Sequence, residues 1–448
     1  MQIKDSMECA KSELDLFSVP PTNTAIEEGH WDNIQPHPNF DQSPVVRFDI
    51  TGTNSHYVDL AATELHVKFA IVVKKGEATV KAPKDSVALV NNFLHSMFEQ
   101  CQVYLNNVPV ENTNKCYAYR AYLENLLCYN KDSKDNLLRG DFFFHENNKI
   151  SEWKEKATNK LVEKTEGFAT KADESVVEYE TYGKIHCDIF NINKYMLNNI
   201  DIKLVFTKSS DSFCLLAEKS KTAQFSIRDT FLRIRRVKVS NAVMLAHAMA
   251  LEQTTAKYPI KRVLVKPFVL PPSSHMFTIS GIHFGTMPTR VVMGFVKTAG
   301  YSGAIDCDPF YFDHIGVTYL NLKVASRSLP YAQGIHTQYY KNNYMQGYLT
   351  LHKNIREASN GITYDGYKAG HTLYAFDLTP DLCSADHFNL LKDGSLDLDV
   401  QIEANPSKTD NPKAELATAT GYTAMFYLEF DNIIEITKER QVLVDYKL

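Results

Sequence analysis

Two histidines stand just ahead of apolar, alternating stretches and are the residues of this chain most suited to ligate a metal. His95 precedes the stretch that starts at Phe98, and His314 precedes Val317. In a cupin-type enzyme the catalytic metal needs an H-x-H pair with a nearby Glu, and none of the 15 histidines forms such a pair. We therefore expect both rings to cap or satisfy buried polar groups, and we predict no metal and no cofactor.

Two charged patterns could also be taken for functional sites. Asp397 and Asp399 occupy alternating strand positions, so we expect them to face solvent together rather than to form a catalytic carboxylate pair. A basic run lies on one later strand, and it comprises Arg233, Arg235, Arg236 and Lys238. Such a run can face nucleic acid or a neighbouring subunit, but a surface of ion pairs is the favoured interpretation.

Composition narrows the functional classes further. The chain has 448 residues and a formal net charge of −5. The protein as a whole therefore has no excess of positive charge that would attract nucleic acid or anionic membranes. It contains no P-loop, G-x-G-x-x-G, G-x-S-x-G or H-E-x-x-H motif, so we predict no enzymatic activity. The eight cysteines form no C-x-x-C pair, and there is no signal-like or membrane-spanning apolar run. We expect synthesis and use in the reducing interior of a cell.

The most regular pattern lies between residues 91 and 130. Apolar and polar residues alternate from Phe98 to Asn106, which predicts a half-buried strand, and Asn106-Asn107 predicts a tight turn into a second short strand. A helix with one apolar stripe is expected next, and the stripe consists of Tyr119, Tyr122, Leu123, Leu126 and Leu127.

A weaker copy of this arrangement follows about two hundred residues later, around Val317 and then Tyr344–Leu351. Two successive β units of this size, each with one helix after its central strand, favour an all-β fold of two eight-stranded antiparallel jelly-roll sandwiches with short connecting helices. The predicted organisation is an arm (1–43), a first jelly roll (44–240) with a charged insertion (130–182), a linker helix (241–257) and a second jelly roll (258–448). The expected core residues are Phe93, Phe98, Val103, Leu105, Leu123, Val317 and Tyr319.

The arm is acidic and rich in proline, with two Lys against eight Asp and Glu. Its prolines argue against regular structure, and its acidity argues against an arm that binds a genome. Four apolar residues without periodicity are expected to dock onto another protein surface, and they are Leu14, Leu16, Phe17 and Trp31.

Ordered short motifs along nearly the whole chain resemble one family. They are Asn91-Asn92-Phe93-Leu94-His95-Ser96-Met97-Phe98, Val103-Tyr104-Leu105-Asn106-Asn107, Tyr119-x-x-Tyr122-Leu123, Glu13-Leu14-Asp15-Leu16-Phe17, Tyr57-Val58-Asp59-Leu60, Lys257-Tyr258-Pro259-Ile260-Lys261-Arg262, Asn360-Gly361-Ile362, Phe376-Asp377-Leu378-Thr379-Pro380-Asp381-Leu382-Cys383 and Glu429-Phe430-Asp431-Asn432. The set is similar to double jelly-roll, hexon-like major capsid proteins, especially those of Polinton/Maverick elements and adintoviruses.

The resemblance implies a structural protein of a virion capsid. Its partners would be two further copies in a pseudo-hexameric homotrimer, neighbouring capsomers, and penton and minor capsid proteins around a DNA genome. It implies no sequence-specific nucleic-acid binding and no membrane span. The alternative is a carbohydrate-binding β-sandwich on a cell or virion surface, which exposed aromatic platforms and a monomeric state would favour.

Overall fold

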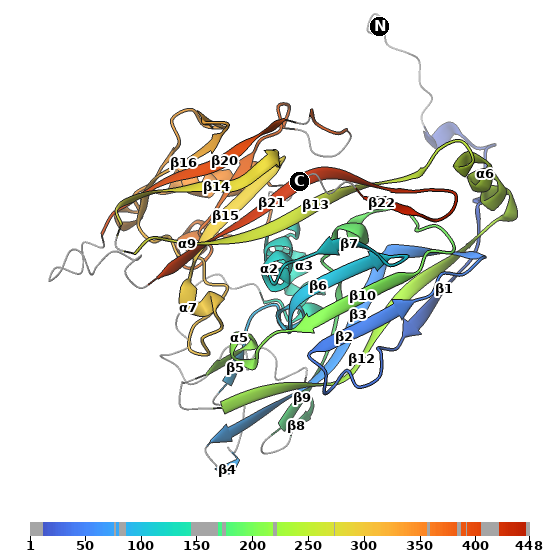
Figure 1. Ribbon diagram of the computed structural model, residues 1–448, viewed down its shortest axis with the longest axis horizontal. Helices are drawn as coiled ribbons and strands as arrows, with labels where there is room; N and C mark the ends of the chain where they lie inside the picture. Colours follow the sequence, from blue (N-terminus) through green and yellow to red (C-terminus); the bar gives the residue numbers. More distant parts are fainter. Residues whose placement is uncertain are drawn as a thin grey trace, which may run out of the picture.

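The computed structural model describes residues 12–75, 78–79, 87–144, 169–172, 176–217, 222–272, 274–355, 359–382, 387–390, 392–404 and 421–444. These residues form two β-sandwiches, one built from the first half of the chain and one from the second (Figure 1). All pairings between named strands are antiparallel. The predicted all-β class is confirmed.

The first sandwich packs a six-stranded sheet against a four-stranded sheet. In order, the larger sheet contains β1 (Ile26–Ile34), β12 (Thr222–Val239), β3 (His56–Lys75), β9 (Val176–Lys184) and β8 (Ala169–Ala172), with β4 (Ala78–Thr79) on β3. The smaller sheet contains β2 (Val45–Ile50), β10 (Ile202–Lys208), β6 (Phe98–Leu105) and β7 (Val108–Asn112). A separate pair is formed by β5 (Val87–Leu89) and β11 (Leu215–Ala217).

The second sandwich has two five-stranded sheets. One contains β13 (Ala256–Val269), β21 (Tyr422–Ile436), β15 (Arg290–Lys297) and β19 (Leu373–Asp377), with β22 (Val442–Val444) on β21. The other contains β14 (Met276–Thr286), β20 (Asp393–Ile402), β16 (Val317–Val324) and β17 (Arg327–Ser328), with β18 (Ile335–His336) on β16.

Short helices fill the connections. The α-helices are α1 (Phe93–Ser96), α2 (Tyr117–Cys128), α3 (Lys131–Asp135), α5 (Asp211–Cys214), α6 (Asn241–Leu251), α7 (Thr298–Tyr301), α8 (Met345–Lys353) and α9 (Tyr364–Lys368). The 3-10 turns are η1 (Ser12–Leu14), η3 (Leu137–Asp141), η6 (Asp188–Asn191) and η7 (Tyr339–Lys341). Within the expected linker helix (241–257), α6 covers only residues 241–251, and β13 of the second sandwich already begins at Ala256.

Local sequence explains the β6–β7–α2 unit well. Alternation along β6 buries Cys101, Val103 and Leu105, as a strand with one face on the core requires. Asn106 and Asn107 both have positive φ (46° and 64°), the conformation that a two-residue hairpin turn needs and that Asn tolerates.

The corresponding strand of the second half departs from simple alternation. Val317 is fully buried, but Tyr319 is only partly buried, and Leu320 and Leu322 take the next core positions. The register of β16 against β20 shifts between Val317 and Tyr319, and such a bulge reverses the faces of all later residues. The expectation that Tyr319 lies in the core is corrected by this irregularity.

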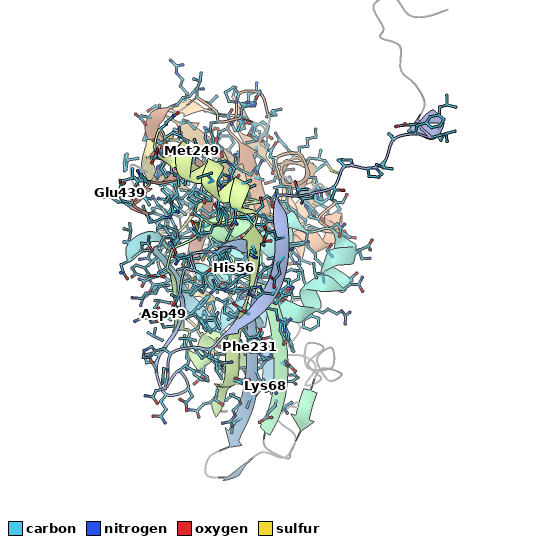
Figure 2. All side chains as sticks on the ribbon, turned by 90° about the vertical axis from the view of Figure 1, so that its right-hand side faces the viewer. Asp49, His56, Lys68, Phe231, Met249 and Glu439 are labelled. Carbon is cyan, nitrogen blue, oxygen red and sulfur yellow. The ribbon has the colours of Figure 1, made fainter. Side chains whose placement is uncertain are left out.

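The arm is shorter than predicted. Residues 26–34, expected to lack regular structure, form strand β1, which pairs with β12 along its length. Trp31 lies opposite Arg235 in this pairing and is half exposed. Of the described part of the predicted arm, residues 12–25 before β1 project from the sandwich (Figure 2).

Helix α2 lies between the two sandwiches (Figure 1), and residues 117–127 are all buried. Tyr117 packs in the first core, whereas Tyr119, Tyr122 and Leu123 pack in the second. Conversely, the ends of β13 and β21 reach the first core, with Tyr258, Ile260, Ile434 and Ile436. The two sandwiches thus share side chains across the predicted boundary at 257/258.

The charged insertion is described only at its ends. Residues 130–144 form α3 and η3 and bury three consecutive phenylalanines, Phe142, Phe143 and Phe144. The predicted bounds are too wide, because β8 (Ala169–Ala172) and most of β9 (Val176–Lys184) fall within 130–182 and belong to the larger sheet, where β9 lies beside β3. Residues 145–168 and 173–175 lie outside the described part of the chain.

Candidate functional site

A buried group of charged residues lies where α2 meets the second sandwich, and we call it the central cluster. Its members are Glu111, Arg120, Glu124, Asp188 and Arg262. Arg120 Nε lies 2.8 Å from Glu124, its Nη2 lies 2.8 Å from Asp188, and its Nη1 pairs with Glu111. Asp188 also lies 3.8 Å from Arg262 on β13, so the cluster joins both halves of the chain.

Burial and charge together set the ionisation of this cluster. Burial opposes ionisation of Glu124, yet the Arg120 guanidinium and the His186 imidazole lower the pKa of that carboxyl to about 2. Burial and the nearby Asp188 carboxylate raise the pKa of Glu111 to about 8. Every member has charged or hydrogen-bonding neighbours, which is the condition for retaining buried charges in a folded chain.

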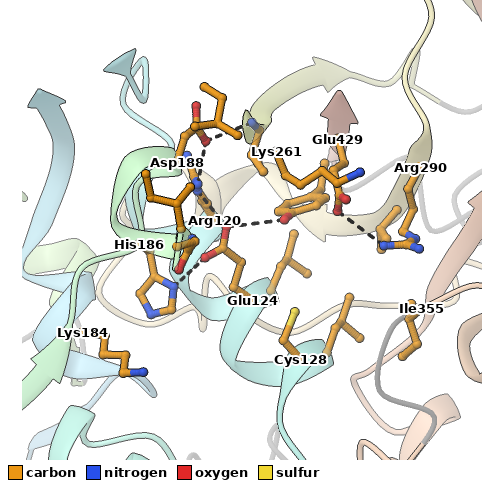
Figure 3. A pocket seen from close by; sticks show the side chains of 18 of the residues that line it. Arg120, Glu124, Cys128, Lys184, His186, Asp188, Lys261, Arg290, Ile355 and Glu429 are labelled. Atoms are coloured by element: carbon orange, nitrogen blue, oxygen red, sulfur yellow. Dashed lines mark hydrogen bonds and ion pairs between the residues drawn. The ribbon is translucent and has the colours of Figure 1, made fainter. Parts of the chain in front are cut away.

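A cavity of about 810 Å³ opens beside this cluster, between the two sandwiches (Figure 3). Its wall includes Glu124, His186 and Lys261, and on the far side Arg290, which lies 3.5 Å from Glu429. The charged groups of the wall are largely engaged with one another. The ion pair between Asp188 and Arg262 connects residues of the first sandwich to β13 of the second.

The two histidines singled out in the sequence are both bonded inside the fold. His314 Nδ1 accepts a hydrogen bond from the Gly316 N–H (3.0 Å), and its ring stacks on Tyr339. His95 is fully buried, and its Nδ1 lies 3.1 Å from the Tyr117 hydroxyl. Burial and the neighbouring His186 ring lower the pKa of His95.

The carboxylates Asp397 and Asp399 do not simply face solvent. Asp397 accepts a hydrogen bond from the Gly281 N–H (2.7 Å), and Asp399 accepts one from the Thr278 hydroxyl (2.8 Å) and pairs with Lys323. They brace β14 and β16 against the central strand β20, which is a structural use of the pair.

The basic run on β12 forms ion pairs with acidic residues of β1 and β3. Arg236 lies 2.7 Å from Asp32, and Lys238 lies 3.0 Å from Glu27, both on β1. Arg235 lies 3.1 Å from Asp59 on β3, and Arg233 lies 3.8 Å from Glu64 on the same strand. Part of the acidity of the N-terminal segment is therefore complementary to the basic strand beside it.

The expected core and arm residues fall into distinct places. The core positions that are buried are Phe93, Phe98, Val103, Leu105, Leu123 and Val317. Leu14, Leu16 and Phe17 are 71%, 76% and 98% exposed, so they are not covered by the residues that the structure describes. A further apolar surface, which sequence reasoning did not single out, lies on α6, where Leu245 and Met249 are both more than 60% exposed.

The sequence reasoning also missed the central cluster. Arg120 and Glu124 are the two charged residues of an otherwise apolar or neutral helix, spaced i,i+4. A charged pair on a helix that is apolar on its other faces is the signal that could have revealed it, because such a helix is buried on more than one side.

We compared the chain with known proteins. No family model matches the sequence. An uncharacterized protein of Caenorhabditis elegans, F54H12.2, is 23% identical over 442 residues, which cover 95% of this chain and 99% of that protein. No helix within the described ranges is long and apolar enough to cross a membrane.

Solved viral structures share the fold over almost the full length. A chain of the Sputnik virophage superposes with a TM-score of 0.67 and 11% identity, covering 99% of this chain and 94% of that one. The mavirus major capsid protein gives a TM-score of 0.58 at 12% identity, covering 99% and 96%. The capsid of PBCV-1 virus gives 0.57 at 11% identity, covering 96% and 99%. The chain thus has the double jelly-roll fold that these viral capsid chains share.

Proposed function

We propose that this protein is a major capsid protein with a structural role, and that three copies form a pseudo-hexameric capsomer. The observation that carries the proposal is the fold itself, which matches viral capsid chains over 94–99% of both partners. Two sandwiches side by side give one chain two similar units, so a ring of three chains presents six. Such a trimer can tile a hexagonal lattice and an icosahedral shell without any active site.

We further propose the Polinton/Maverick–adintovirus group as the origin of the chain. The ordered motifs along the sequence support this assignment, from Glu13–Phe17 to Glu429–Asn432. A nematode protein that is collinear over 442 residues fits a capsid gene carried by an element resident in animal genomes. The shell would enclose a DNA genome without sequence-specific contacts and would be completed by penton and minor capsid proteins.

Two apolar surfaces supply contacts for assembly. The first is the segment before β1, with Leu14, Leu16 and Phe17, and the second is the outer face of α6, with Leu245 and Met249. Burying each such side chain stabilises a contact by about 1.5–3 kcal/mol. We assign the α6 face to contacts within the capsomer and the N-terminal segment to contacts with the base of the same or a neighbouring capsomer.

Light scattering on purified full-length protein tests the oligomeric state. A trimer has three times the 50.9 kDa chain mass, and negative-stain images of it are expected to show a hexagonal outline. A stable monomer at micromolar concentration would contradict the capsid assignment. If that monomer also bound glycans, the carbohydrate-binding alternative would replace it.

A further inference from the structure

Three buried side chains converge beside the central cluster from separate elements. His95 lies on α1, Asp141 ends η3, and His186 follows β9. One ligand atom from each lies within 4.8 Å of the other two, and His95 Nε2 is 3.8 Å from the Asp141 carboxylate. The three residues are 0%, 4% and 5% exposed. We call this group the His–Asp–His triad.

The two histidines of the triad each use one ring nitrogen and leave the other unused. His95 Nδ1 is bonded to the Tyr117 hydroxyl, and His186 Nδ1 lies 2.6 Å from the Glu124 carboxylate. Within the described residues, Nε2 of each ring is buried without a hydrogen-bond partner. For His186, a carboxylate that accepts from Nδ1–H fixes the tautomer with its lone pair on Nε2, an arrangement typical of histidines that bind metals.

The carboxylate of the triad is held in place by its surroundings. Asn125 Nδ2 donates to Asp141 Oδ2 (3.1 Å), and Gly183 on β9 leaves room for the other oxygen. A Cβ at position 183 would lie only 1.7 Å from Asp141 Oδ1. The carboxylate therefore fits against the strand only because residue 183 has no side chain.

We propose that the His–Asp–His triad binds a structural divalent transition-metal ion, for which zinc is the best fit. Two imidazole nitrogens and one carboxylate oxygen form a ligand set that zinc accepts, whereas calcium and magnesium prefer oxygen ligands alone. In a tetrahedral zinc site, ligand atoms are about 3.3 Å apart, so the observed separations close by small side-chain shifts. Water or another polar group completes the tetrahedron.

The position of the triad suggests a structural use. Of its three residues, His186 also lines the cavity between the sandwiches. Asp141 lies in the first part of the charged insertion (130–182), His186 lies just after its end, and His95 belongs to the α1 turn of the first core. A bound ion would connect η3 and the residue that follows β9 to α1. Because the site exists only in the folded chain, binding would stabilise the folded state.

Zinc binding by the full-length protein tests the proposal. Protein stripped with EDTA and dialysed is titrated with zinc sulfate in competition with a fluorescent chelator, and bound metal is counted by mass spectrometry. We expect one zinc ion per chain and a higher melting temperature with zinc than without it. His95→Gln and, separately, Asp141→Asn are expected to weaken binding by about a hundredfold or more, because each removes one of three ligands.

His66→Gln is the matched control. His66 is equally buried and lies 2.7 Å from the Glu180 carboxylate, but among the described residues it belongs to no such triad. The control should bind zinc like the wild type. Equal zinc affinity in His95→Gln and wild type would overturn the proposal, as would wild-type protein that binds no zinc.

Cobalt(II) provides a readout that does not depend on the folding of a variant. Wild-type protein loaded with cobalt should show the intense visible absorption of a four-coordinate ion held by nitrogen and oxygen. A weak, octahedral spectrum unchanged by excess zinc would also overturn the proposal, because it would indicate cobalt on the surface.

Discussion

Arg120 keeps its charge in the centre of the molecule because Glu111, Glu124 and Asp188 surround it. Replacing Arg120 by Met removes the cation and leaves carboxylates buried without their counter-charge. Breaking a buried ion pair in this way typically costs about 3–5 kcal/mol. We therefore expect urea unfolding of Arg120→Met to show a loss of that size, or insoluble protein.

Arg233→Met is the matched control for this substitution. Arg233 lies 3.8 Å from Glu64, and both side chains are more than one-third exposed. Surface pairs of this kind contribute about 0–1 kcal/mol, so the control should be close to wild type. Equal losses in the two variants would show that the central cluster has no special role in stability.

We expect His314 to make folding of the second sandwich sensitive to pH. Burial lowers the pKa of His314, with Asp313 opposing and Lys368 reinforcing the effect, and the ring packs on Tyr339 and Tyr340. A histidine whose folded pKa lies below its unfolded value of about 6.5 contributes stability above pH 6.5 and loses it as the pH falls. Protonation would also convert Nδ1 from the acceptor of the Gly316 N–H into a donor.

The His314→Asn variant isolates this contribution. Its amide oxygen can still accept the Gly316 N–H, but it does not titrate. We expect the free energy of unfolding to fall less between pH 7 and pH 5 in His314→Asn than in wild type. If the free energy of unfolding changes equally with pH in the two proteins, protonation of His314 does not destabilise the folded state.

Among the elements, those with local signals could be predicted from sequence and those that depend on distant partners could not. The strand at Phe98–Leu105, its Asn106-Asn107 turn and helix α2 follow from alternation, turn chemistry and helical spacing. Strand β1 has no such signal, because its pairing and its ion pairs come from β12, about 200 residues later. The bulge in β16 was likewise invisible, since it arises from the register with β20.

The same limit applies to the candidate sites. His95 and the basic run could be singled out by residue type, and the exposure of Leu14, Leu16 and Phe17 agrees with a segment that lacks periodicity. The partners of those residues could not be foreseen, because Asp141 and His186 lie 46 and 91 positions beyond His95 in the chain. Spatial convergence of that kind is set by topology and not by local spacing.

Removing the N-terminal segment and removing β1 are expected to have different effects on assembly and on thermal stability. Deleting residues 1–24 removes Leu14, Leu16 and Phe17 but keeps β1, so the trimer should fold and melt as wild type while shells form poorly. Deleting residues 1–41 also removes Glu27 and Asp32 and exposes the edge of β12, so it should lower the melting temperature. Electron microscopy and thermal melts separate the two effects.

Either of two results would contradict this assignment. Closed particles at wild-type yield from the shorter deletion would make the exposed segment dispensable. Identical melting temperatures for the two deletions would show that β1 adds nothing to the first sandwich.

Helix α6 offers a second test at this scale. Leu245→Ser with Met249→Ser replaces two exposed apolar side chains and leaves the His247–Tyr57 hydrogen bond (2.8 Å) in place. If the outer face of α6 lies between subunits, light scattering should show a shift toward monomer at unchanged monomer stability. A trimer of wild-type affinity would exclude α6 from the interface.

For the whole molecule, shared packing predicts one cooperative unit. Tyr122 on α2 stacks on Phe310 with ring centroids 4.3 Å apart, and Ile434 and Ile436 of the second half lie in the first core. Calorimetry should therefore show a single transition, and Tyr122→Ala should lower it as a whole by an amount equivalent to about 3–5 kcal/mol. Two resolved transitions would show that the sandwiches unfold separately.

The position of α2 also has a consequence for the growing chain on the ribosome. The Tyr119 hydroxyl donates to the carbonyl of Pro309, which is made 190 residues later. At a synthesis rate of about 5–20 residues per second, the packing partner of α2 is translated roughly 10–40 s after the helix itself. During that interval the first sandwich of the nascent chain exposes the tyrosine side chains of α2 to neighbouring nascent chains, with which they can associate. We therefore expect chaperones to be needed most on polysomes that translate this message.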